Sequence, residues 1–170
     1  MILTRKTRWR DIAPLIGHLD LDAILDKVEE EPLQKDILDI TCGDFIGLLN
    51  QDSHTAEKVV GSPKAALVML GRLKTMRRRM KEIGEYITAN DYTQDSMVQK
   101  AAAGVRFPTP QERILLDVQQ RYHLRSLDEA EKAPLTDYLL MVRDQTARAK
   151  FESNLQNLQK QKYNLKNKKK

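Results

Sequence analysis

The feature that most constrains the fold is a run of apolar side chains at heptad spacing. Between residues 62 and 89, apolar residues recur at alternating intervals of three and four. Over three heptads this spacing predicts a helix of about 27 residues, roughly 40 Å long, with one apolar side. Ser62 and Pro63 favour a start there, as N-cap and first helical residue. The candidate core seam, which we expect to organise the fold, consists of Met69, Leu73, Met76, Met80, Ile83 and Ile87.

The remaining elements are also predicted to be helices. No stretch alternates Val, Ile and Thr between Asn-Gly or Asp-Gly turns, so we expect an all-α fold, a helical bundle. Short helices are expected over 12–19, 21–29 and 95–103. Thr109-Pro110-Gln111-Glu112 and Ser126-Leu127-Asp128-Glu129 have the capping-box pattern. The first box predicts a helix with Ile114, Leu115, Val118 and Tyr122 inward, and the second a short helix interrupted by Pro134, before a last long helix from about Leu135.

The C-terminal helix is expected to leave the core along its length. Its apolar stripe thins steadily, and residues 153–170 are rich in Asn, Gln and Lys, which is too polar for a core. The stripe consists of Tyr138, Val142, Ala149, Leu155, Leu158 and Leu165. We therefore expect one helical domain over 1–152, with a basic N-terminal arm, and a polar, Lys-rich extension over 153–170.

Chemistry-bearing residues are sparse. A lone Cys42 excludes an internal disulfide, and His18, His54 and His123 have no His or Cys neighbour at metal-ligand spacing. Gly61-Ser62-Pro63-Lys64 lacks the frame of a phosphate loop. We therefore predict no catalytic residues, no metal site, no cofactor and no enzymatic activity. No apolar run approaches the roughly 20 residues that span a bilayer, which predicts a soluble, unexported chain without a membrane partner.

Charge is arranged in blocks. Residues 11–57 hold two Lys against twelve acids, residues 58–81 hold eight cations and no acid, and residues 153–170 hold six Lys and no acid. The cations either pair with acids, in the same chain or in a neighbouring copy, or contact nucleic-acid phosphate. We favour pairing for the central run and assign the tail to a neighbour or a polyanion. The candidate subunit-contact or DNA-contact residues are Arg72, Lys74, Arg77, Arg78, Arg79, Lys81, Lys166, Lys168, Lys169 and Lys170.

Three stretches carry a resemblance to a known family. They are Thr7-Arg8-Trp9-Arg10-Asp11-Ile12, Gly43-Asp44-Phe45, and the run from Thr109-Pro110-Gln111-Glu112 through Leu127-Asp128-Glu129-Ala130-Glu131 to Asp137-Tyr138-Leu139-Leu140. In these stretches the chain resembles small helical virion proteins of crAss-like bacteriophages, which infect Bacteroides. Within that group it is similar to the ring proteins that lie below the portal and join head to tail.

The resemblance implies a non-enzymatic protein that forms a multi-copy ring, usually twelvefold, around a DNA channel. Its partners would be other copies of itself, the portal, other connector or tail proteins, and packaged DNA through non-specific phosphate contacts. Its location would be the virion, assembled in the host cytoplasm. Connectors often add a β-element, and no strand is predicted here. Two alternatives therefore stay open: a nucleic-acid-binding or packaging accessory protein, and a tail assembly chaperone or helical adaptor.

Overall fold

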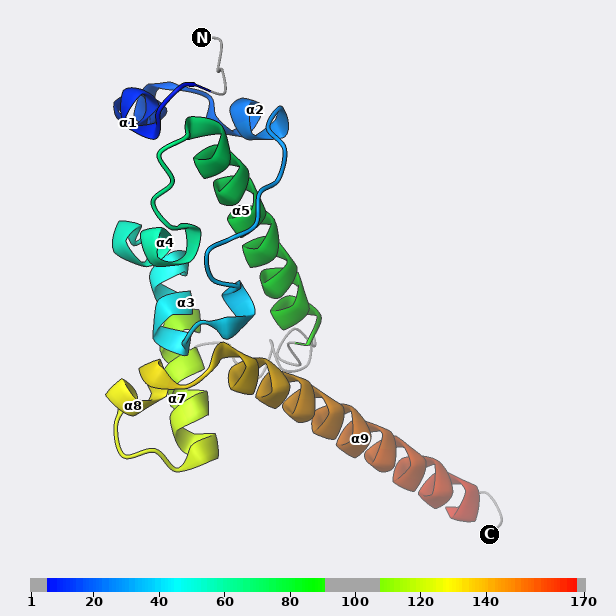
Figure 1. Ribbon diagram of the computed structural model, residues 1–170. Helices are drawn as coiled ribbons and strands as arrows, with labels where there is room; N and C mark the ends of the chain where they lie inside the picture. The colour runs from blue at the N-terminus through cyan, green and yellow to red at the C-terminus, as the bar shows by residue number, and fades with distance from the viewer. Residues whose placement is uncertain (1–5, 91–107, 168–170) are drawn as a thin grey trace.

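The computed structural model describes residues 6–90 and 108–167, and side chains up to residue 163 (Figure 1). This part of the chain is all-α, as the sequence predicts, with two isolated β-bridges and no strand. Its elements are α1 (Trp9–Ile12), η1 (Ala13–His18), α2 (Leu21–Asp26), η2 (Ile37–Asp39), α3 (Cys42–Leu49), α4 (Ser53–Val60), α5 (Ala66–Ala89), α7 (Pro110–Tyr122), α8 (Leu127–Lys132) and α9 (Leu135–Asn167), where η marks a 3₁₀ helix.

Local capping signals place three helix starts correctly. α7, α8 and α9 begin at Pro110, Leu127 and Leu135. Thr109 and Glu112 form the predicted reciprocal capping box. In α8 the Ser126 hydroxyl accepts from the backbone N–H of Glu129, but the Glu129 carboxylate accepts from the N–H of Arg125 instead of Ser126. The helix expected over 95–103 lies outside the described residues.

The expected start of the long central helix is wrong by several residues. α5 begins at Ala66, and Ser62 is not its N-cap, because the Ser62 hydroxyl donates to Glu57 of α4 instead. The backbone just before α5 pairs with the N-terminal arm. The N–H of Trp9 donates to the carbonyl of Lys64 at 2.8 Å, and the N–H of Ala66 to that of Thr7 at 3.0 Å. These pairings hold the preceding residues extended.

Two apolar clusters form the core. The larger one gathers residues of η2, α3, α7, α8 and α9 against the second half of α5, with Phe45, Val118 and Leu135 fully buried. The smaller one joins α1 and α2 to the first turns of α5. α5 thus runs along both clusters (Figure 1). Of the candidate seam, Met69 and Ile83 are buried, whereas Leu73, Met76, Met80 and Ile87 are half-buried.

Two side chains show where a single seam was too simple a description. Leu70 is buried in the smaller cluster, and Thr75 is buried on another side of α5.

Tyr122, expected to point inward from α7, is 44% exposed, because it lies in the last turn of its helix, just before His123 takes a left-handed conformation.

α9 is partly core and partly a projecting rod. Its first three turns contribute buried side chains, namely Leu135, Tyr138, Met141, Val142 and Thr146. From residue 151 to residue 163 every side chain is exposed. The helix has 33 residues, so it is roughly 50 Å long. Figure 1 shows that its distal half extends away from the other helices. We refer to residues 151–163 as the α9 rod.

Candidate functional site

An extended segment, residues 27–36, crosses the face of α5 and is here called the acidic strap. It contains three consecutive glutamates, Glu29, Glu30 and Glu31. The Thr75 hydroxyl of α5 donates to the backbone carbonyl of Glu31 at 2.8 Å. Gly71 permits the close approach, because a Cβ there would lie 2.5 Å from the carbonyl oxygen of Glu29. The strap therefore brings carboxylates onto the basic face of α5.

Two candidate cations of α5 pair with acids of the 11–57 block. Arg77 contacts the carboxylate of Asp22 in α2. The Nε of Arg78 lies 3.0 Å from the Glu30 carboxylate, and its Nη1 contacts Glu82 one turn further along α5. These hydrogen bonds, to Glu82 first and then to Glu30, raise the pKa of Arg78, and the same contact with Arg78 lowers the pKa of Glu82.

Two further cations bind backbone carbonyls. The Nζ of Lys74 lies 2.9 Å from the carbonyl oxygen of Val28 and 3.4 Å from that of Asp26, where α2 ends. The Nη1 of Arg72 donates to the carbonyl of Val60 at 2.8 Å, at the end of α4. Cations at helix C-termini satisfy carbonyls that have no partner within the helix.

The last two candidate cations of this run pair within α5 itself. The Nη1 of Arg79 lies 3.2 Å from the Glu82 carboxylate, and the Nζ of Lys81 lies 3.8 Å from that of Glu85. All six candidate cations of α5 thus have partners inside the chain. Nucleic-acid phosphate would have to compete with those partners.

The candidate cations of the tail lie at the end of the described chain. Lys166 is within α9, although its side chain is not described, and Lys168, Lys169 and Lys170 lie outside the described residues. The α9 rod itself carries Lys160 and Lys162, both exposed.

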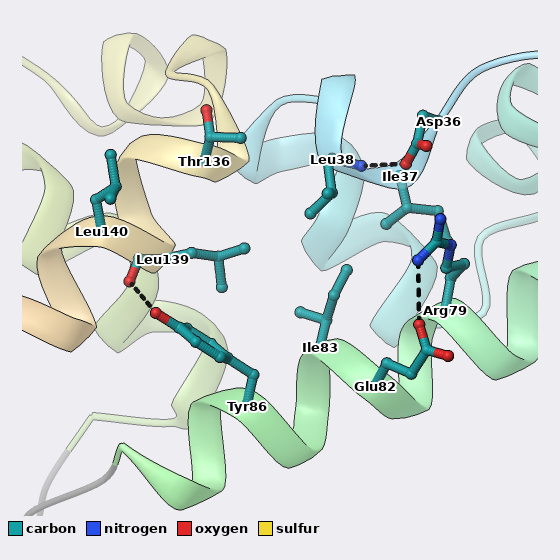
Figure 2. A pocket seen from close by; sticks show the side chains of 10 residues that line it. All are labelled: Asp36, Ile37, Leu38, Arg79, Glu82, Ile83, Tyr86, Thr136, Leu139 and Leu140. Carbon is teal, nitrogen blue, oxygen red and sulfur yellow. Dashed lines mark hydrogen bonds and ion pairs between the residues drawn. The ribbon is translucent and has the colours of Figure 1, made fainter.

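An apolar groove lies between α5, η2 and the first turns of α9 (Figure 2). Its volume is about 480 Å³. Leu38, Tyr86 and Leu140 line it and are 40%, 37% and 62% exposed. The Tyr86 hydroxyl donates to the carbonyl of Leu139 at 3.4 Å, which fixes the ring against α9. The remaining lining residues are Asp36, Ile37, Arg79, Glu82, Ile83 and Thr136.

The charged edge of the groove is acidic on balance. Figure 2 shows Asp36 of the strap and the Arg79–Glu82 pair of α5 together at one end, with the leucines and Tyr86 around the remainder. Glu82 is bonded to both Arg79 and Arg78, and the described residues provide no salt bridge for Asp36. The groove therefore suits an apolar ligand that carries positive charge.

The α9 rod bears an exposed apolar stripe. Phe151, Leu155 and Leu158 are 66%, 44% and 62% exposed. At 100° per residue they lie within about 60° of one another and of Leu140, so the stripe continues the rim of the groove along α9. The sequence contains no acid after Glu152. After Glu152 the charged side chains of the rod are Lys160, on the opposite face, and Lys162, which follows the stripe on the same face.

Reactive groups are not assembled into a catalytic or metal site in the described part of the chain. Burial raises the pKa of the Cys42 thiol to about 11, with the charge of Asp137 as a second cause, so the thiolate is disfavoured. His18, His54 and His123 are exposed. Over 6–90 and 108–167, no group of three or more His, Cys, Asp or Glu residues is placed to hold a metal ion.

Comparisons with protein-family models, curated proteins and solved structures find no match to this chain. Among the described helices, none combines the length and the apolar character needed to cross a membrane.

The groove is the feature that sequence reasoning missed. Its lining comes from three segments far apart in the chain, and Leu38 lies in a 3₁₀ turn without apolar periodicity. The sequence indicates the rod more clearly, because Leu155 and Leu158 belong to the apolar stripe that it predicts on the last helix.

Proposed function

We propose that this chain is a structural protein that assembles with copies of itself into a multi-copy ring, as a component of the head-to-tail connector of a tailed bacteriophage. The observation that carries the proposal is the α9 rod. This helix extends beyond its domain and exposes Phe151, Leu155 and Leu158 along one face. In the isolated chain these apolar side chains stay in water and add no buried apolar surface. Exposed apolar stripes of this kind mark interaction surfaces.

The distribution of charge supports assembly with like copies. The cations of α5 are held by partners in the same chain, whereas Lys160 and Lys162 of the rod are exposed, with no acid in the sequence after Glu152. A contact between two different surfaces of the same chain is heterologous, and such contacts close into rings when the rotation between copies allows it. The resemblance to connector ring proteins supports the same assignment.

A second candidate function is non-specific nucleic-acid binding as a packaging accessory. The observation that favours it is the exposed rod with Lys160 and Lys162, followed by four more lysines in the sequence, with no acid after Glu152. Such a segment attracts phosphate by charge alone, with an affinity that falls steeply as salt rises.

Native mass spectrometry of the purified full chain, with and without double-stranded DNA, distinguishes these functions. The ring proposal predicts a closed oligomer of one defined size in the absence of DNA. A species that forms only with DNA would favour the accessory protein. A monomer or dimer under both conditions would contradict the ring and favour a chaperone or adaptor.

A further inference from the structure

We propose that the α9 rod of one copy occupies the apolar groove of a second copy, with Phe151, Leu155 and Leu158 as its anchors. This inference deepens the proposed function and rests on it, because it names the contact through which the copies would assemble. The anchors follow the i, i+4, i+7 spacing with which amphipathic helices bind apolar grooves. The groove offers a matching apolar lining in Leu38, Ile83 and Tyr86.

The rod that fills the groove cannot come from the same chain. Leu139 and Leu140 of α9 line the groove, and α9 continues from them as an unbroken helix to Asn167. A continuous helix cannot fold back on its own wall, and the rod points away from the other helices (Figure 1). Any α9 rod in this groove therefore belongs to another copy.

Charge complementarity favours a second copy as the occupant. The rod carries Glu152 at its start and then only positive charge, at Lys160 and Lys162. The groove has Asp36 at its edge, a carboxylate for which the described residues provide no salt bridge, whereas Glu82 is bonded to both Arg78 and Arg79. Lys162 lies on the same face as the anchors, about one turn beyond Leu158, so docking the anchors brings this lysine toward the edge that holds Asp36, where complementary charge guides register and association.

Continuity of the two surfaces also favours this occupant. Leu140 is 62% exposed, lies at the groove, and shares its helix face with Phe151 and Leu158. A second α9 laid on this face would cover the groove and the stripe together. One contact would therefore bury both exposed apolar surfaces.

The first test places charge on the rod. Leu155→Glu with Leu158→Glu removes two anchors, whereas the control Ser153→Glu with Gln156→Glu adds the same charge on the opposite face of the same segment. All four side chains are exposed, so neither variant disturbs the core. Because docking would bury two half-exposed leucines, their replacement should raise the dissociation constant of self-association at least about 30-fold. The control variant should change the dissociation constant of self-association by no more than about threefold, because changes of exposed charge contribute little to binding free energy.

The second test identifies the contact directly. Copies with Leu38→Cys are mixed under mild oxidation with copies with Leu158→Cys, and the mixed disulfide is sought by peptide mass spectrometry. Cys42 stays in place, because it is buried and its thiol pKa is raised. Copies with Ser153→Cys on the rod's other face are the matched control. The inference predicts the disulfide for residue 158 and at most a trace for residue 153.

The outcomes separate this contact from the ring. The mixed disulfide together with a native mass of only two copies would support the docking and contradict the ring. A closed ring that persists in the Leu155→Glu, Leu158→Glu variant, without the disulfide, would overturn the docking and leave the ring standing. A full chain that remains a monomer would overturn both.

Discussion

Gly71 and Gly84 lie on the same helix, and the same substitution should have opposite effects at the two positions. Ala normally stabilises a helix interior by about 1 kcal/mol relative to Gly. At Gly71 a Cβ would lie 2.5 Å from the carbonyl oxygen of Glu29 and 2.6 Å from the Cγ of Glu31. The carbonyl is a backbone atom, so the added methyl fits only if the acidic strap moves.

The contacts of the acidic strap determine how much Gly71→Ala should lower the free energy of unfolding. Overpacking of this kind costs about 1–3 kcal/mol. Moving the strap also weakens the hydrogen bond from the Thr75 hydroxyl to the carbonyl of Glu31, which is worth about 1 kcal/mol. After the gain in helix propensity, Gly71→Ala should lower the free energy of unfolding by about 1–3 kcal/mol.

Gly84→Ala is the matched control. Within the described residues, no atom beyond the neighbouring backbone of α5 lies within 4 Å of the position of its Cβ, so only the propensity gain remains. This variant should raise the free energy of unfolding by up to about 1 kcal/mol. Urea unfolding followed by circular dichroism measures both changes, and each kcal/mol shifts Tm by about 2–4 °C. If Gly71→Ala proved as stable as Gly84→Ala, the strap would not be packed on α5 as described.

Three further predictions concern the charges and the thiol. Arg78→Glu should lower Tm by repelling Glu30 and Glu82, and adding Glu30→Arg should restore part of the loss; a double variant no better than the single one would contradict the pairing. Burial raises the pKa of Asp117, so its charged form opposes folding above that pKa. Asp117→Asn should therefore raise Tm at pH 7 and lose this advantage below about pH 4, where the carboxyl is protonated in both states; an equal gain at both pH values would refute the charge effect. Cys42 should resist iodoacetamide at pH 8 in the folded chain and react after unfolding, whereas rapid alkylation of the folded chain would place the thiol at the surface.

The sequence predicts those features that depend on neighbouring residues. The starts of α7, α8 and α9 follow from Thr109, Ser126 and Pro134, because capping groups and proline act within one turn. The polar composition after Phe151 likewise predicts that the last helix leaves the core, and the side chains of the rod are exposed.

Features made by distant segments could not be predicted in this way. α5 begins at Ala66 instead of Pro63 because the backbone before it pairs with residues 7–9, nearly sixty positions earlier. The strap has no periodicity of its own, and its place on α5 depends on the absent side chain of Gly71. The groove forms only when η2, α5 and α9 meet, so no single stretch of sequence indicates it.

Assembly of copies of this chain through the α9 rod can be measured in solution. Its most direct test compares the solution mass of the full chain with that of a chain ending at Lys150, by sedimentation velocity at matched concentrations. Every side chain from 151 to 163 is exposed, so the shortened chain should keep its Tm. We expect a multi-copy assembly for the full chain and a monomer for the shortened one. A shortened chain that keeps the mass of the full assembly, or a full chain that stays monomeric at high micromolar concentration, would contradict it.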